Sequence, residues 1–297
     1  MRSRTFLLNL QLSLIMSFLL VPLVVNAQTL NESELKSAFK KEIYSIIDKL
    51  NFSFGLAFMD FRDYDTLFYN ENESFPTASA IKIEILLHLL KEYESKNINI
   101  YDKTLVNKRV GGSGLLQYFD QNDLKLSYFN LAILMIQQSD NTATNILIEH
   151  LQMDKINQTI KNLNLNKTKL QRIMMDFEAR KAGKENISTP LDKLNLLKII
   201  YDGEILPDSI RKLAVEILSI PKETPLLSDI NDEKIKLASK GGELSDVRCE
   251  MGIFYHPDFN YGLVIMTKNL TSSKDGDEIM KKISGLVYNY VSKKYSN

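Results

Sequence analysis

The sequence predicts a mixed α/β (α+β) fold, in which an antiparallel sheet is flanked by helices and joined to an all-helical lobe. Two patterns predict it. Helical periodicity dominates the chain from about residue 79 to about residue 190. Runs typical of strands lie on either side of this middle part. We therefore expect an α/β lobe built from about residues 28–78 and 191–297, a helical lobe of about residues 79–190, and a cleft between them.

The first elements are a helix, a hairpin and a second helix. Residues Glu32–Leu50 carry apolar side chains at three- and four-residue steps, which predicts an amphipathic helix. Phe54–Asp60 and Thr66–Tyr69 are apolar and aromatic runs, and the polar segment Arg62–Asp65 between them indicates a hairpin. A long helical pattern then covers Ile81–Tyr93.

The later elements are helices, then strands, then one more helix. The clearest helical patterns of the middle part are Leu131–Leu151 and Leu191–Tyr201. A final amphipathic helix begins near Ile279. Between them we expect three strands, Ile235–Lys240, Glu250–His256 and Tyr261–Lys268, the last two joined by a turn at Pro257.

Composition excludes several classes of protein. The 297 residues are 44% hydrophobic and 25% charged, which is ordinary for a globular protein. Basic and acidic residues number 37 each, so the formal net charge is zero and we expect no nucleic-acid partner. The single cysteine, Cys249, permits neither an internal disulfide nor a cysteine-based metal cluster, and we interpret it as a buried structural thiol. His88, His150 and His256 are scattered, so we expect no metal and no cofactor.

The first residues have the three-part pattern of a secretory signal peptide. Arg2 and Arg4 precede a mostly apolar run, Phe6–Val25, and a small-x-Ala pattern ends at Ala27. We expect residues 1–27 to be removed and residues 28–297 to form one exported catalytic domain. A retained membrane anchor is the alternative, because the apolar run is near spanning length.

Ser79 and Lys82 form the first candidate catalytic pair. Three residues apart at the start of a helix, they lie on the same face, one turn apart. A serine hydroxyl becomes a good nucleophile only when a base takes its proton. A lysine buried near other cations can be neutral enough to be that base. Taken alone, the pair is better explained by a capping serine and a surface lysine.

Two further motifs follow along the chain. Ser139-Asp140-Asn141 lies between two helical stretches, where Ser139 could relay a proton and Asn141 could hold a carbonyl, or the three residues could simply cap a helix. Lys240-Gly241-Gly242 ends a predicted strand. Glycines such as Gly242 let another molecule approach the strand backbone, although a plain strand-end turn is the alternative.

Together the three motifs resemble the class A β-lactamase family. Ser-x-x-Lys, Ser-Asp-Asn and Lys-x-Gly occur in the order that is the signature of class A β-lactamases and penicillin-binding proteins. The resemblance covers almost all of the chain after residue 35 and implies the β-lactamase/transpeptidase-like fold. It also implies an acyl-enzyme on Ser79, activated with the help of Lys82.

The resemblance assigns the remaining roles. Ser139 would deliver a proton to the departing nitrogen, and Asn141 would orient the substrate's side-chain amide. Lys240 would attract the substrate carboxylate, with Arg248 as a candidate second cation or, alternatively, a surface charge on a strand. The oxyanion hole would consist of the backbone N–H groups of Ser79 and of Glu243, just past Gly242.

Two departures from the family stand out. Gly241 takes the place of the usual serine or threonine, so one hydroxyl for carboxylate binding is missing. Class A enzymes also carry a glutamate that activates the deacylating water, in a loop that corresponds here to Thr168–Pro190. Met174 stands where that glutamate is expected. Asp176 and Glu178 lie two and four residues further on, and either or neither could replace it.

The sequence thus predicts a periplasmic, monomeric serine hydrolase that acts on β-lactams and would confer antibiotic resistance, with no stable membrane insertion after signal cleavage. Two alternatives stay open. One is a D-Ala-D-Ala peptidase or another serine amidase or esterase. The other is a penicillin-binding sensor that is acylated at Ser79 without turnover.

Overall fold

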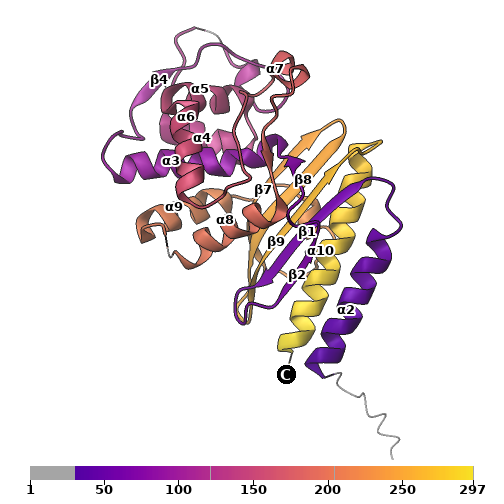
Figure 1. The fold of residues 1–297 in the computed structure, drawn as a ribbon. Helices are drawn as coiled ribbons and strands as arrows, with labels where there is room; N and C mark the ends of the chain where they lie inside the picture. The colour runs from indigo at the N-terminus through magenta and orange to yellow at the C-terminus, as the bar shows by residue number, and fades with distance from the viewer. Residues whose placement is uncertain (1–30, 121, 204, 297) are drawn as a thin grey trace, which may run out of the picture.

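One antiparallel sheet organises the molecule (Figure 1). The computed structural model describes residues 31–120, 122–203 and 205–296, so the expected signal peptide lies outside the described residues. The five strands have the spatial order β2-β1-β9-β8-β7, and every neighbouring pair is antiparallel. Their bounds are β1 (Ser53–Asp60), β2 (Thr66–Tyr69), β7 (Lys236–Leu244), β8 (Val247–Tyr255) and β9 (Asn260–Lys268).

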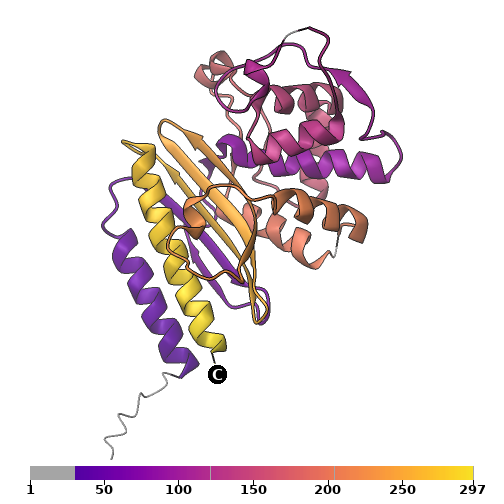
Figure 2. The same cartoon turned by 180° about the vertical axis from the view of Figure 1, so that it is seen from behind.

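The sheet joins the two ends of the chain. β1 pairs along its whole length with β9, with Leu56 opposite Ile265. The helices α2 (Glu32–Ile47) and α10 (Ser273–Tyr295) lie together over one face of the sheet (Figure 2). The apolar sides of these two helices and of the sheet form one buried core, in which Phe39 of α2 stacks on Tyr290 of α10. The antiparallel sheet flanked by helices that the sequence predicts is therefore confirmed.

The other face of the sheet carries the helical part of the chain. α8 packs on β9 and β1, and α3 lies at the centre of the helices, in contact with α4, α5, α6 and α9. A second, larger core fills this side of the molecule. The helices of this part are α3 (Lys82–Glu94), α4 (Tyr128–Gln137), α5 (Asn141–Leu151), α6 (Met153–Asn162), α7 (Phe177–Lys181), α8 (Pro190–Asp202) and α9 (Asp208–Leu218). Two short pairings, β3 (Phe75–Pro76) with β6 (Ile187–Ser188) and β4 (Lys103–Leu105) with β5 (Lys125–Ser127), complete it.

One strand boundary differs from the prediction in a way that matters for the site. The sequence predicts a strand ending at Lys240, whereas β7 continues through both glycines to Leu244, which pairs with Val247. Glycine is unfavourable inside a strand, and for this reason the sequence pattern predicts that the strand ends before Gly241. The ladder with β8 nevertheless holds the segment extended, so the strand-end turn considered as an alternative is wrong.

Among the described residues, no helix is both long enough and apolar enough to cross a membrane.

Candidate active site

Ser79 lies in a short 3-10 turn, η1 (Ala78–Ile81), which leads directly into α3. Its neighbours Ala78, Ala80 and Ile81 are buried, whereas Ser79 is partly exposed and lines a cavity of about 790 Å³. Ala78 has a left-handed backbone, with φ of 45°. The turn therefore places Ser79 and its neighbour Ala78 at the surface of the cavity.

Lys82 is fully buried, and among the described residues the hydrogen-bond acceptors of its amine are all neutral. Its Nζ donates to the Ser139 carbonyl at 2.7 Å, to Ser139 Oγ at 3.2 Å and to Asn141 Oδ1 at 3.1 Å. Burial lowers the pKa of Lys82 well below its ordinary value of 10.5, and the positive charge of Lys240 lowers it further, while Asp140 opposes both. The surface lysine considered from the sequence is therefore wrong, and the surroundings of Lys82 favour the neutral form of its amine.

The second motif combines a helix cap with two cavity residues. Asp140 caps α5 by accepting from the Ala143 amide at 2.9 Å, as the capping alternative expected. Ser139 and Asn141, on either side, line the cavity instead. Ser139 is held with a left-handed φ of 51°, and Ser113 Oγ donates to its carbonyl at 2.8 Å. The break between α4 and α5 therefore places both residues at the cavity that Ser79 lines.

Lys240 reaches the same point from the edge strand β7. It is 4% exposed, and its Nζ donates to Ser139 Oγ at 3.1 Å and to the Gly241 carbonyl at 2.7 Å. Burial lowers the pKa of Lys240 to about 8, although the carboxylate of Glu250 acts in the opposite direction. Ser139 Oγ thus lies within hydrogen-bond distance of two amines, those of Lys82 and Lys240.

Gly242 is required where β7 passes the nucleophile. A Cβ on Gly242 would lie 2.6 Å from the Ser79 amide nitrogen and 2.5 Å from the Thr77 carbonyl oxygen, so no other residue fits. This close approach places the backbone of Glu243, the next residue, beside the Ser79 turn. The backbone N–H groups of Ser79 and Glu243 are therefore the two candidates for an oxyanion hole.

Arg248 and two residues that the sequence did not single out form the far wall of the cavity. Arg248, on β8, pairs with Glu250 at 3.0 Å and with Asp277. Glu250 and Lys222 also line the cavity. The pKa of Lys222 is lowered to about 8 by burial. Only the β7–β8 register, which sets Glu250 opposite Gly241, could have revealed Glu250.

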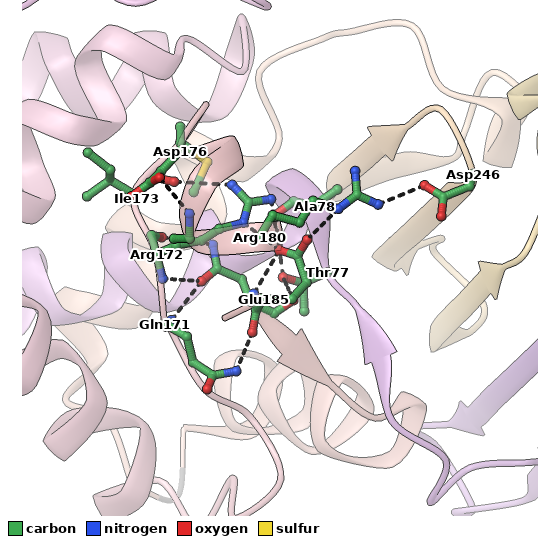
Figure 3. Close-up of polar contacts among 12 residues, drawn as sticks. Thr77, Ala78, Gln171, Arg172, Ile173, Asp176, Arg180, Glu185 and Asp246 are labelled. Carbon is green, nitrogen blue, oxygen red and sulfur yellow. Dashed lines mark hydrogen bonds and ion pairs between the residues drawn. The ribbon is translucent and has the colours of Figure 1, made fainter. Parts of the chain in front are cut away.

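The loop that follows α6 is tied to the nucleophile turn and to the sheet (Figure 3). Arg172 pairs with Glu185 at 2.8 Å, and Arg180 bridges Glu185 to Asp246 at 3.2 and 2.9 Å. The carbonyl of Asn186 accepts from the Thr77 amide at 2.8 Å, two residues before Ser79. These contacts fix the loop as one wall of the cavity.

The loop presents a methionine to the cavity, and its nearby carboxylates have other partners. Met174 lines the cavity, and its backbone exchanges two hydrogen bonds with the Asn145 side chain, at 2.8 and 3.1 Å. Asp176 caps α7 by accepting from the Ala179 amide at 2.9 Å. Glu178 is exposed and pairs with Lys181 at 2.8 Å. In the described residues, neither carboxylate lines the cavity.

The single thiol and the histidines lie outside this chemistry. Cys249 is buried, and burial raises the pKa of its thiol to about 12, so it has the character of an inert core residue. The described parts of the chain contain no cluster of three or more His, Cys, Asp or Glu side chains that could hold a metal ion.

Comparison with known proteins agrees with the geometry. The beta-lactamase enzyme family matches residues 38–291. A beta-lactamase from Bacteroides uniformis is 24% identical over 290 residues, which cover 91% of this chain and 95% of that protein. The structure of PBP-A superposes with a TM-score of 0.79 at 24% identity, covering 86% of this chain and 97% of PBP-A. A class A beta-lactamase from Bacteroides cellulosilyticus gives 0.76 at 20% identity, covering 86% and 98%. These likenesses confirm the β-lactamase/transpeptidase-like fold, and the family match shows that the chain belongs to the beta-lactamase enzyme family.

Proposed function

We propose that the protein is a serine hydrolase acting on β-lactams through an acyl-enzyme on Ser79, and that release of the acyl group is its slow step. The observation that carries the first part is the environment of Lys82. Its amine is fully buried, is surrounded by neutral acceptors and has a second cation nearby. Such an amine can take the proton of a serine hydroxyl at neutral pH.

Acylation follows as a closed proton path. Ser79 Oγ forms a bond to the β-lactam carbonyl carbon while its proton passes to Lys82 Nζ. The N–H groups of Ser79 and Glu243 stabilise the oxyanion, each contributing about 3–4 kcal/mol of barrier lowering. When the C–N bond breaks, Ser139 Oγ gives its proton to the departing nitrogen. Lys82 restores the Ser139 proton, because its amine lies 3.2 Å from Ser139 Oγ.

Binding would use the polar groups at the two ends of the cavity. Asn141 donates through its Nδ2 to the Gly111 carbonyl at 3.1 Å, which orients its side chain at the cavity edge. We assign Asn141 to the substrate amide, and Lys240 and Arg248 to a group at the opposite end. Gly242 lets the Ser79 turn pack directly against β7.

Release of the acyl group needs a base for water, and this is where the site departs from class A enzymes. Met174 lines the cavity at the position of the expected glutamate. Asp176 and Glu178 are engaged in a helix cap and a surface ion pair. A positioned base contributes about 10²- to 10⁴-fold to a rate. Without one, we expect the adduct to persist long after acylation is complete.

The test is a time course of intact protein mass after addition of benzylpenicillin. Wild type should gain one adduct that decays slowly, and Ser79→Ala should gain none. Lys82→Arg should acylate far more slowly, because arginine is always protonated and cannot act as a base. Asp176→Asn and Glu178→Gln should release the adduct at the wild-type rate. Equal turnover by wild type and Ser79→Ala would refute the assignment.

A peptidase or a penicillin-binding protein that retains its acyl group is the second candidate. Met174 favours it, because the site lacks the usual deacylating carboxylate at that position. A point mutant of PBP-A, with which this fold superposes, has been solved as an acyl-enzyme complex with penicillin G. Hydrolysis of peptides ending in D-Ala-D-Ala, compared with β-lactams on the same enzyme, separates the two.

We also propose that the protein is exported and acts in the periplasm as a monomer. The pattern of residues 1–27 supports export. Mass spectrometry of protein recovered from the periplasm should show a chain beginning at Gln28. Light scattering should give the mass of a single chain.

A further inference from the structure

A buried carboxylate stands in the wall of the cavity where the site otherwise collects cations. Glu250 is 4% exposed, lies on β8 and lines the cavity. Nothing in the proposed acylation chemistry uses it. Because a buried charge is costly unless it is paired, its presence in this wall calls for a reason.

Glu250 and Gly241 are a matched pair. The two residues are directly opposite each other in the β7–β8 ladder. A Cβ on Gly241 would lie 2.1 Å from Glu250 Oε1 and 2.6 Å from its carboxyl carbon. The carboxylate therefore occupies the space in which a side chain at position 241 would begin. The missing hydroxyl of the Lys-x-Gly triplet has been replaced, in space, by an acid.

The charges around Glu250 come from three separate segments. Arg248 Nη1 lies 3.0 Å from Glu250 Oε1, and Thr224 Oγ1 donates to Oε2 at 3.2 Å. The carboxylate also raises the pKa values of Lys240 and Lys222, against the lowering effect of their burial. One internal anion thus interacts with three cations that line the cavity.

We propose that Glu250 is a specificity-determining residue. Its carboxylate interacts with the cations that would otherwise bind a substrate carboxylate, and the site therefore prefers acyl substrates that carry no negative charge near these cations. A hydroxyl at position 241 would donate a hydrogen bond to an incoming carboxylate. Burial raises the pKa of Glu250, whereas Arg248 and Lys240 favour its carboxylate form. In that form Glu250 repels an incoming carboxylate, and its ion pair already occupies the Arg248 guanidinium. Rejection by a like charge is an established route to specificity. The inference rests on the proposed function for the identity of the reacting group, but not for the charge preference itself.

The test measures equilibrium binding without chemistry. In a Ser79→Ala background, calorimetry would compare benzylpenicillin with its methyl ester, which lacks the negative charge. Glu250→Gln should raise the ratio of acid to ester affinity at least about tenfold. Glu223→Gln removes the same charge from an exposed residue of the same cavity, and it should change the ratio less than twofold.

A second variant covers the case in which Glu250→Gln folds poorly because Arg248 loses its partner. Gly241→Ser combined with Glu250→Ala places a hydroxyl in the vacated space, and this pair should raise the ratio as well. The proposal is overturned if the ratio of acid to ester affinity stays unchanged in the folded Glu250 variants, or if none of them binds the acid more tightly than the parent. Failure of wild type to form a Ser79 adduct would instead overturn the proposed function, because the binding ratio does not depend on acylation.

Discussion

Replacing Met174 by glutamate should convert slow release of the acyl group into turnover. The side chain of Met174 lines the cavity and is 6% exposed. Its backbone is held on both sides by the Asn145 side chain, at 2.8 and 3.1 Å. Glutamate has a similar length, so its carboxylate would stand where the methionine thioether now faces the cavity, with no shift of the loop.

The expected increase in the deacylation rate equals the contribution of the general base that Met174→Glu would add. A positioned general base contributes about 10²- to 10⁴-fold, so the decay of the Ser79 adduct should accelerate by that factor while acylation stays within a few fold. The change also has a cost. An incompletely paired buried carboxylate destabilises by about 1–3 kcal/mol. For a chain of this size that lowers the melting temperature by roughly 2–10 °C.

Intact-mass spectrometry after a pulse of benzylpenicillin measures the decay directly, and calorimetry checks the cost. Met174→Gln is the matched control, because it has the same shape and polarity without a basic oxygen. The control should retain the adduct as wild type does. The reasoning is refuted if Met174→Gln accelerates release as much as Met174→Glu, or if neither changes it.

Two further predictions concern buried charges. Lys193 and Glu84 form an ion pair of 2.6 Å, and both side chains are fully buried. Lys193→Met should lower the free energy of unfolding, measured in urea, by about 3–5 kcal/mol, whereas adding Glu84→Leu should recover most of that loss. An equal loss in the single and the double variant would contradict this. Burial brings the pKa values of Lys240 and Lys222 to about 8, and each amine is charged below that value. Affinity of Ser79→Ala for benzylpenicillin should therefore fall as pH rises through about 8, with no such fall for its methyl ester in the same titration.

The architecture was accessible from the sequence because it depends on local periodicity. The hairpin strand Thr66–Tyr69 matches its predicted bounds, and the break at Ser139 lies between two helical patterns as expected. The end of β7 was missed because Gly241 and Gly242 have low strand propensity, and only the ladder with β8 keeps them extended.

The site was accessible only where a motif carries the chemistry. Ser79, Lys82, Ser139 and Lys240 meet as the ordered motifs implied. Glu250 could not be found in this way, because its importance comes from lying opposite Gly241, and register between two strands is not a local property.

The Ser-x-x-Lys motif does not by itself determine the pKa of its lysine, as a comparison of two buried lysines shows. Lys82 and Lys193 are both fully buried. Lys193 forms an ion pair of 2.6 Å with Glu84. Lys82 has carbonyl and amide oxygens in place of a carboxylate, and the cation of Lys240 nearby. Burial and the charge of Lys240 therefore lower the pKa of Lys82, whose amine has no acidic hydrogen-bond partner among the described residues. Residues 57 to 158 positions further along the chain supply that environment, so the base is a property of the fold rather than of the Ser-x-x-Lys sequence.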